Sequence, residues 1–422
     1  MNAPSTDPLY YTDPMNRTCT AAVLSATTFN GEQSLVLDRT VFYPAGGGQP
    51  GDRGSLYIGA STGGADGNPG ETALNISDTQ KDDHGTIYHI LPRDKNPAVT
   101  LHPGTQISIS VDWPHRFEYM QQHTGQHILS GALMHAIGAA TVSVHQGEEA
   151  LTIETDRESV SDDEIATVEA VARAAVAEDL AIRAFEVSDG DLPEYRLRRP
   201  TTRRGTIRLV EIDGFDLVAC GGVHLPRTAL AGTIKITGAE RIRGRVRISA
   251  KIGTRADDDY SIKHRIMTTL SARLSSGVPD IADRVDQALL EIQDLHRTNR
   301  LMTERIAGFL TGELVAANGP VAKIYENEDP SVFTALGKAI SGTQGLLACI
   351  INRESGRVQW AIVFTLPGEF PATLIRTGVL QPTGSKGGGR APIWQGVCPD
   401  ADEFRNAFLA VATRIQAQNR SG

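Results

Sequence analysis

The sequence has little cysteine and no long apolar run. Only 4 of its 422 residues are cysteine, and these are widely spaced and form no CxxC pair. Three of them have no motif around them, which indicates buried small hydrophobic side chains in a reducing compartment and excludes a disulfide framework. Because no segment reaches the roughly 20 apolar residues of a membrane span, and the first residues are polar and contain prolines, we predict a cytoplasmic protein without a membrane partner.

Positive charge is also in deficit. Lysine and arginine number 41 against 50 aspartates and glutamates, and the net charge of −9 by itself argues against a polyanionic partner. Two local clusters override this average: six arginines lie within 196–208, and four alternate with other residues within 241–247. On a strand predicted over Ile242–Lys251, the alternation sends the arginines to one face. We expect Arg243 and Arg245 to contact RNA phosphates; the alternative is a solvated sheet face paired with carboxylates.

Two short motifs almost a hundred residues apart offer ligands for a metal ion. In His123-Thr-Gly-Gln-His127 the histidines lie four residues apart in an apolar-periodic run, so both imidazoles share one face of a helix. In Cys220-Gly-Gly-Val-His224 two glycines let the backbone bring both side chains to one point. Imidazole nitrogen and thiolate sulfur are the usual tetrahedral ligands of zinc. We therefore predict that His123, His127, Cys220 and His224 bind Zn²⁺.

A third motif, Phe42–Asp52, contains the successive glycines Gly46, Gly47 and Gly48 followed by Gln49. Glycines leave the backbone N–H groups accessible to a ligand, and a glutamine side chain offers both a donor and an acceptor. For an arbitrary run of glycines a hairpin turn is the simpler interpretation. With the two histidine motifs following in the chain, we favour a loop that faces the substrate.

The alternation of short β-type runs and helical periods predicts an α+β protein with four parts. A small β-barrel or curled sheet is expected over 1–112. An α/β sandwich with the metal ligands is expected over 113–255, with a helix from Trp113 to about Ile137 and a second helix that begins with a capping box at Ser161 and Glu164. A helical linker over 256–318 and a C-terminal α/β domain over 319–422 complete the chain.

The helical linker carries a narrow apolar stripe. After a break near Ser275, apolar residues recur at steps of three, four or seven from Val285 to Phe309. Such a stripe is typical of a coiled-coil seam or a helical hairpin. It predicts a homodimer contact through the linker or the C-terminal domain, and packing within the same chain is the open alternative.

These motifs together resemble the editing domain of alanyl-tRNA synthetases and the free-standing AlaX editing proteins, in their long form. The resemblance rests on the glycine loop, HxxxH, Cys-Gly-Gly-x-His and the arginines of 240–253, in this order. Gly-Gly-Gly-Arg at 387–390 is similar to the DHH-associated domain at the C-terminus of the synthetases. Only about forty residues precede the glycine loop, where a synthetase carries its aminoacylation portion. We therefore expect no charging of tRNA.

The resemblance implies an aminoacyl-tRNA deacylase that acts in trans, hydrolysing the ester of tRNA(Ala) mischarged with serine or glycine. In that family the four His and Cys side chains bind zinc, and the glycine loop faces the substrate. Selection of serine over alanine needs a partner for the serine hydroxyl. The expected hydroxyl readers and catalytic residues are Gln49 and Thr124, with Thr141 and Ser143 as further candidates.

Two questions stay open at the level of sequence. Zinc could activate water, polarise the carbonyl or hold the substrate's amino group, and a site in which all four ligands bind has the closed pattern of a structural metal. The competing function is therefore a zinc-stabilised tRNA-binding module without catalysis. Release of amino acid from mischarged tRNA separates the two.

Overall fold

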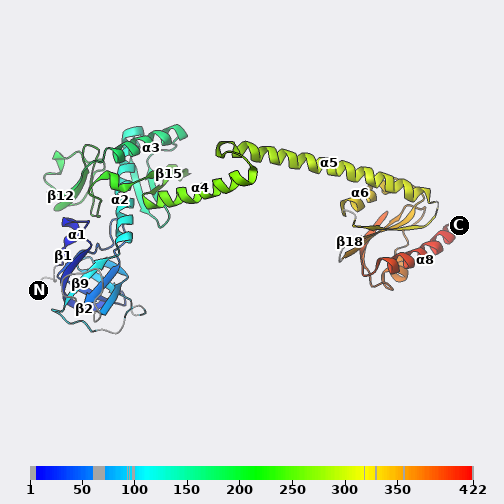
Figure 1. Cartoon of the computed structure of the whole chain (residues 1–422), viewed down its shortest axis with the longest axis horizontal. Helices are drawn as coiled ribbons and strands as arrows, with labels where there is room; N and C mark the ends of the chain where they lie inside the picture. The colour runs from blue at the N-terminus through cyan, green and yellow to red at the C-terminus, as the bar shows by residue number, and fades with distance from the viewer. Residues whose placement is uncertain are drawn as a thin grey trace. The chain divides into compact units, whose positions relative to one another are not determined.

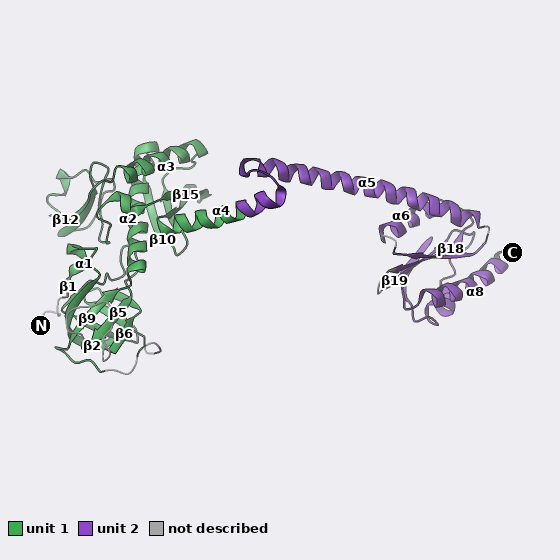
Figure 2. Ribbon diagram, in the orientation of Figure 1, with its two compact units in different colours: residues 1–267 green, residues 268–422 purple. Residues whose placement is uncertain are grey.

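The computed structural model describes residues 6–59, 72–92, 94, 96, 100–317, 319–327, 330–354 and 357–420. Its chain forms two compact units, residues 1–267 and 268–422 (Figure 2). The division falls inside helix α4 (Thr254–Leu274). Among the residues that the structure describes, no helix combines the length and apolar character that crossing a membrane requires.

The first unit opens with a seven-stranded antiparallel sheet of order β6-β5-β9-β2-β3-β8-β7. Its buried apolar side chains, among them Leu35, Leu56 and Ile109, form one core. The strands are β2 (Thr18–Phe29), β3 (Glu32–Leu37), β5 (Gly54–Ile58), β6 (Thr72–Ile76), β7 (Asp78–Lys81), β8 (Ile87–Leu91) and β9 (Gln106–Val111). Short elements beside it are β1 (Asp7–Pro8), α1 (Leu9–Thr12) and β4 (Arg39–Thr40).

Of the expected small barrel or curled sheet, the structure shows a curled sheet that no ladder of hydrogen bonds closes into a barrel among the described residues. Strands β6 and β7 stand at its two ends, and the described residues show no ladder between them. The physical reason is their order along the chain, because only Ser77 separates the two strands. Strands joined by one residue run on in the same direction and have no turn that could lay them side by side. The two edges of the sheet therefore meet at Ser77, so the sheet curls, but no ladder of hydrogen bonds joins β6 to β7 in the described part of the chain.

Helix α2 (Trp113–Ile137) is the central element of the first unit and confirms the predicted helix through the histidine pair. Asp112 caps its first turn by accepting the N–H of His115, and Pro114 fits the position where no N–H is needed. Gly138 ends it with a left-handed φ of 64°. Most side chains from Arg116 to Leu133 are buried, so α2 runs through the protein with neighbours on nearly every side (Figure 1).

Two further sheets and a second helix surround α2. One sheet has the order β10-β11-β16-β15 and the other β12-β13-β14. Helix α3 (Asp162–Ala177) packs on α2 and begins with the predicted capping box of Ser161 and Glu164. The strands are β10 (Thr141–Gln146), β11 (Leu151–Thr155), β12 (Ile182–Ser188), β13 (Thr206–Ile212), β14 (Asp216–Ala219), β15 (Ile234–Ile242) and β16 (Arg245–Ile252). The class is α+β as predicted, with two sheets in place of one.

The strand predicted over Ile242–Lys251 is wrong at its start, and the arginine stripe is therefore broken. Arg243 and Gly244 form a two-residue turn between β15 and β16, with φ of 51° and 80°. Positive φ at both positions is the geometry of a type I′ hairpin, whose twist matches that of its strands. Arg241 lies opposite Val246, on the face away from Arg245. The four guanidinium groups consequently do not share one face.

The second unit contains a long helix and a mixed sheet. Helix α5 (Ile281–Ala316) packs on α6 (Pro330–Ser341), and the sheet has the order β17-β18-β19-β21-β20 with only β17 and β18 parallel. Strands and helices are both present in this part of the chain, as the expected C-terminal α/β domain requires. The remaining elements are β17 (Val321–Glu326), β18 (Leu347–Glu354), β19 (Arg357–Phe364), α7 (Ala372–Ile375), β20 (Lys386–Arg390), β21 (Ile393–Cys398) and α8 (Ala401–Arg420).

A fully buried histidine links the N-terminal sheet to the start of the glycine loop. His89 Nδ1 donates to the carbonyl of Leu35 (3.1 Å), and Nε2 accepts from the Thr40 hydroxyl (2.8 Å). That hydroxyl also accepts the N–H of Phe42. Burial lowers the pKa of His89 from 6.5 to about 4, against the smaller opposing effect of the Leu35 carbonyl. The imidazole is therefore neutral in the folded protein above that pH.

We predict that His89 makes the folded state sensitive to mild acid. Between pH 6.5 and about 4 the unfolded chain binds a proton at His89 and the folded protein does not, so stability falls as the pH falls. The loss approaches roughly 3 kcal/mol at the lower limit. His89→Gln retains a donor and an acceptor but does not titrate, so its denaturation midpoints should depend less on pH. The exposed His84→Gln is the matched control; equal pH dependence in His89→Gln and wild type would contradict the prediction.

Candidate metal centre

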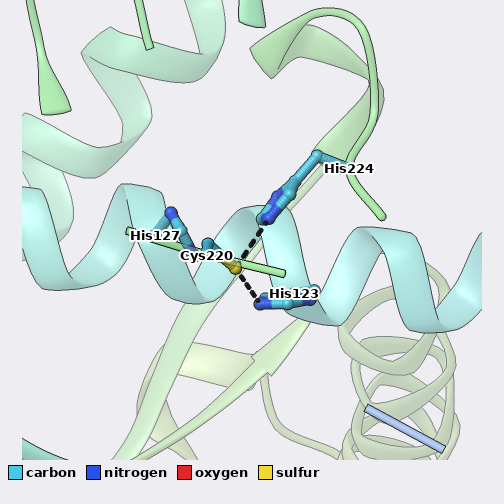
Figure 3. A group of neighbouring side chains, drawn as sticks. All are labelled: His123, His127, Cys220 and His224. Atoms are coloured by element: carbon cyan, nitrogen blue, oxygen red, sulfur yellow. Dashed lines mark hydrogen bonds between the residues drawn. The ribbon is translucent and has the colours of Figure 1, made fainter. Parts of the chain in front are cut away.

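Four side chains from two distant segments converge in the first unit. His123 and His127 come from α2, and Cys220 and His224 come from the loop after β14 (Figure 3). Their ligand atoms all lie within 4.8 Å of one another. Cys220 Sγ is 3.3 Å from His123 Nε2 and 3.4 Å from His224 Nε2. The structure thus brings together all four predicted ligands as a group that could hold a metal ion.

Gly222 is required for the loop to bring its ligands next to helix α2. A Cβ on Gly222 would lie 2.0 Å from His123 Cε1 and 3.1 Å from Gln49 Oε1, far inside van der Waals contact. Arg208 holds the same loop from the other side, donating from Nη1 to the carbonyls of Cys220 (2.9 Å) and Gly222 (2.8 Å). The loop can therefore approach the helix only with a glycine at 222.

The protonation states suit metal ligation. Burial lowers the pKa of His123 to about 4, with a further contribution from Arg208. Burial and the neighbouring imidazoles hold the pKa of His224 well below its ordinary value. Burial by itself raises the pKa of the Cys220 thiol, but His127, the Gly222 N–H and Arg208 oppose it, and the net pKa is lowered. Neutral imidazoles and a thiolate are the forms that bind a metal.

Each histidine also faces an oxygen atom away from the centre. His123 Nδ1 lies 2.8 Å from Gln49 Oε1, and His224 Nδ1 lies 3.3 Å from the Thr124 hydroxyl. Hydrogen bonds of this kind fix the tautomer, with the proton on Nδ1 and Nε2 free for a metal. His127 Nδ1 has no hydrogen-bond partner in the described part of the chain and lies 3.8 Å from the buried carboxylate of Asp216. The donor set and its supporting oxygens therefore fit a tetrahedral metal ion.

The glycine loop lies directly beside this cluster. Gly46 and Gln49 exchange both backbone hydrogen bonds at 3.0 Å, and Gly47 and Gly48 between them have positive φ, so the motif is a two-residue hairpin turn. The turn interpretation is correct, and the loop also reaches the site. Gln49 is 2% exposed and its Nε2 has no partner among the described residues. A buried amide donor without a partner is one that a bound molecule can use.

A cavity of about 550 Å³ opens on the cluster. Its walls include Gly47 of the glycine turn, three of the four candidate metal ligands, and part of the arginine-rich connection that precedes β13. The volume is in the range of small-ligand sites. Its lining residues are Gly47, His123, Gln126, His127, Thr141, Val144, Arg198, Arg199, Pro200, Thr201, Thr202, Arg203, Val218, Ala219 and Cys220.

The other predicted site residues lie in different surroundings. Thr124 is fully buried, with its hydroxyl against His224 and the N–H of Leu225 rather than on the cavity wall. Of the further hydroxyl candidates, Thr141 lines the cavity, whereas Ser143 donates to Glu154. Gly46, Gly48, Gln49, Arg243 and Arg245 are not among the residues that line the cavity, although Gln49 contacts His123, which does.

Sequence reasoning missed two residues that support the cluster. Asp216 receives Arg198 Nε at 2.7 Å and Nη2 at 3.2 Å, and its other neighbour is His127. Arg208 was grouped with the RNA-binding arginines, yet it holds the Cys220 loop. Asp216 lies four residues before the cysteine, at the start of β14. Nothing in the sequence distinguished it from other acidic residues near a turn.

Comparison with known proteins places these features in context. Residues 9–115 match the family model of the class II (A) tRNA synthetases, and residues 207–248 match the threonyl and alanyl tRNA synthetase second additional domain. The first match contains the glycine loop and the second contains Cys220 and His224.

Two kinds of relative align with most of this chain: long alanine–tRNA ligases and shorter alanyl-tRNA editing proteins. The alanine–tRNA ligases of Pyrococcus abyssi and Pyrococcus furiosus are 27% and 30% identical over 97% of it, but the chain spans only 43% of either ligase. The alanyl-tRNA editing protein Aarsd1 of Mus musculus is 27% identical over 394 residues, covering 90% of this chain and 89% of its own length.

We predict that removing one ligand empties the centre. His123→Ala or Cys220→Ala should lower the metal content of the purified protein from about one ion per chain to a small fraction, because three donors remain and one imidazole or thiolate is lost. Metal analysis by mass spectrometry measures this directly. His135→Ala, an exposed histidine on the same helix, should leave the content unchanged. Full retention of metal in both ligand variants would reject the four-residue site.

Proposed function

We propose that this chain, which is similar to the alanyl-tRNA editing proteins, is an AlaX-like, trans-acting deacylase for tRNA(Ala) mischarged with serine or glycine. The observation that carries the proposal is the position of the His and Cys cluster on the wall of a cavity that also reaches the glycine loop and three arginines. Such a combination of metal ligands, a small pocket and positive charge suits the hydrolysis of an ester at the end of a nucleic acid.

The proposed metal is Zn²⁺, held by His123, His127, Cys220 and His224. Three nitrogens and one thiolate favour it over magnesium or calcium, which prefer oxygen ligands. When bound, zinc supplies a positive charge that can stabilise negative charge developing on the substrate. Gln49 and Thr124 hold the imidazoles of His123 and His224 in the required tautomer.

We propose that Gln49 also reads the serine hydroxyl. Its Oε1 is occupied by His123, whereas Nε2 is buried and has no partner in the described chain. A site with a buried donor for a substrate hydroxyl can lower kcat/KM for an analogue without the hydroxyl by up to about 10⁴-fold. An apolar pocket discriminates between such substrates by only about 10²-fold. Alanine leaves the Nε2 donor unsatisfied, and serine satisfies it. For glycine, selection would rest on a pocket too tight for a methyl group.

The turn between β15 and β16 is a second candidate for tRNA contact. Arg243 and Arg245 are exposed at its tip, so they remain available to phosphates although the full stripe is absent. Arg247 pairs with Glu154 at 2.6 Å and Arg241 lies 3.7 Å from Glu158. The solvated, carboxylate-paired interpretation therefore fits these two, and the proposal rests on Arg243 and Arg245.

One observation favours a different function. If all four side chains ligate at once, no position is open to water or substrate, which is the pattern of a structural zinc. A zinc-stabilised tRNA-binding module without catalysis would retain the cluster and the arginines. It would not need a buried amide donor without a described partner on the side chain that contacts His123, and for this reason we favour the deacylase.

We further propose that α5 forms a homodimer contact. Its domain-facing side, with Ala307 and Leu314, is buried against its own unit, while another side leaves large apolar residues exposed, including Leu295 at 68% and Phe309 at 77%. These residues follow a heptad repeat with β-branched residues at most a positions and a single asparagine, a pattern that favours two parallel strands. The a positions are Val285, Ile292, Asn299 and Ile306, and the d positions are Ala288, Leu295, Met302 and Phe309.

For the deacylase we predict release of serine and glycine from mischarged tRNA(Ala), with alanyl-tRNA(Ala) left largely intact. Gln49→Ala should lower the ratio of seryl to alanyl hydrolysis roughly fivefold or more, because one hydrogen bond of about 1 kcal/mol is lost. Rates per bound metal ion, measured side by side on the three substrates, provide the test. Thr124→Ala is the control and should slow all three alike. Equal wild-type rates would reject selective editing, and no release would favour the binding module.

For α5 we predict a dimer in solution that depends on the heptad positions. Ile292→Asp together with Leu295→Asp should yield a monomer by sedimentation equilibrium, since buried charge in a seam destabilises association. Leu290→Asp replaces an exposed leucine outside the seam and should remain dimeric. A monomeric wild-type protein would indicate that the stripe packs within its own chain.

A further inference from the structure

The arginine-rich connection, residues 196–204, is fixed to the strand that leads into Cys220. The backbone N–H of Arg198 donates to the carbonyl of Leu217 (2.9 Å), and its guanidinium donates from two nitrogens to Asp216. The Asp216 side chain is fully buried, and that of Arg198 is 9% exposed. A buried bidentate pair of this kind holds both partners in one geometry. These contacts hold the connection at Arg198 in a fixed position on the cavity wall.

Two positive charges on this wall lack a counterion. Arg198, Arg199 and Arg203 line the cavity, and no aspartate or glutamate is among its lining residues. Asp216 compensates Arg198, but Arg199 and Arg203 are exposed and form no ion pair within the described residues. Arg203 also lies beside the cysteine loop, since a Cβ on Gly221 would be 3.9 Å from its Nη1. The uncompensated charge thus stands next to the metal cluster.

This arrangement has an electrostatic cost that an anion would remove. Guanidinium groups near a metal ion repel it. Ordinary surface arginines avoid the cost by lying elsewhere or by pairing with carboxylates. Two unpaired guanidinium groups at one cavity suit a phosphate, which accepts several N–H donors at once.

We infer that Arg199 and Arg203 form a phosphate subsite for the 5′-phosphate of the nucleotide that carries the aminoacyl ester. This inference rests on the proposed deacylase function, because that substrate places an ester and a phosphate on the same ribose. The phosphate is then the anion nearest to the reacting carbonyl. A cavity of about 550 Å³ is large enough for one nucleotide. The two arginines fix the ribose so that its ester lies at the cluster.

The direct test compares adenosine 5′-monophosphate with adenosine by titration calorimetry on the metal-loaded full chain. Wild-type protein should bind the monophosphate roughly tenfold to hundredfold more tightly, as expected for charge-assisted hydrogen bonds to phosphate. Arg199→Ala together with Arg203→Ala should abolish that difference. The control, Arg196→Ala with Arg204→Ala, removes the same charge from the same connection but from residues that do not line the cavity, and should retain it.

The inference is overturned if the monophosphate binds no better than adenosine, or if the control variant loses as much affinity as the cavity variant. A hydrolysis assay separates it from the proposed function. If wild type fails to release amino acid but the phosphate preference follows Arg199 and Arg203, the deacylase proposal falls and the subsite stands. If hydrolysis proceeds with unchanged KM in the Arg199 and Arg203 variant, the subsite falls and the deacylase stands.

Discussion

The architecture of the first unit depends on one buried ion pair. Arg116 is fully buried on α2, two turns before His123, and its Nε lies 2.9 and 2.8 Å from the two carboxylate oxygens of Asp52. Its remaining nitrogens donate to the carbonyls of Pro14 and Val41. Removing one member of such a pair leaves an uncompensated buried charge and costs about 3–5 kcal/mol. The pair therefore joins the helix, the N-terminal segment and the glycine loop at one point.

The geometry of the metal centre follows from that junction. Asp52 comes three residues after Gln49, so fixing Asp52 on α2 also fixes the amide that meets His123 Nδ1. From the opposite side, Tyr11 donates to the Gly221 carbonyl at 2.9 Å and stacks under Arg208. Hydrogen bonds from outside the cluster thus position His123, His224 and the loop of Cys220, which is the kind of arrangement that holds metal geometry within narrow limits.

How far the sequence predicts this molecule depends on whether the relevant contacts are local. Helix α2 and its paired imidazoles follow from four-residue spacing, and the capping box of Ser161 follows from a four-residue pattern. The turn at Arg243 was not predictable in the same way, because arginine rarely adopts positive φ and the surrounding alternation fits a continuous strand. The role of Asp216 and the open edge of the N-terminal sheet depend on tertiary neighbours that no local pattern encodes.

The separation of the ligands along the chain has a consequence for biosynthesis. When a ribosome has made the first half of the centre, the nascent chain contains Gln49 and the two imidazoles of α2, but Cys220 and His224 are nearly a hundred residues from being synthesised. Two neutral imidazoles alone bind a metal weakly, and β14, which brings the cysteine, is also absent. Any metal that this cluster holds must therefore be loaded late, after most of the first unit has emerged.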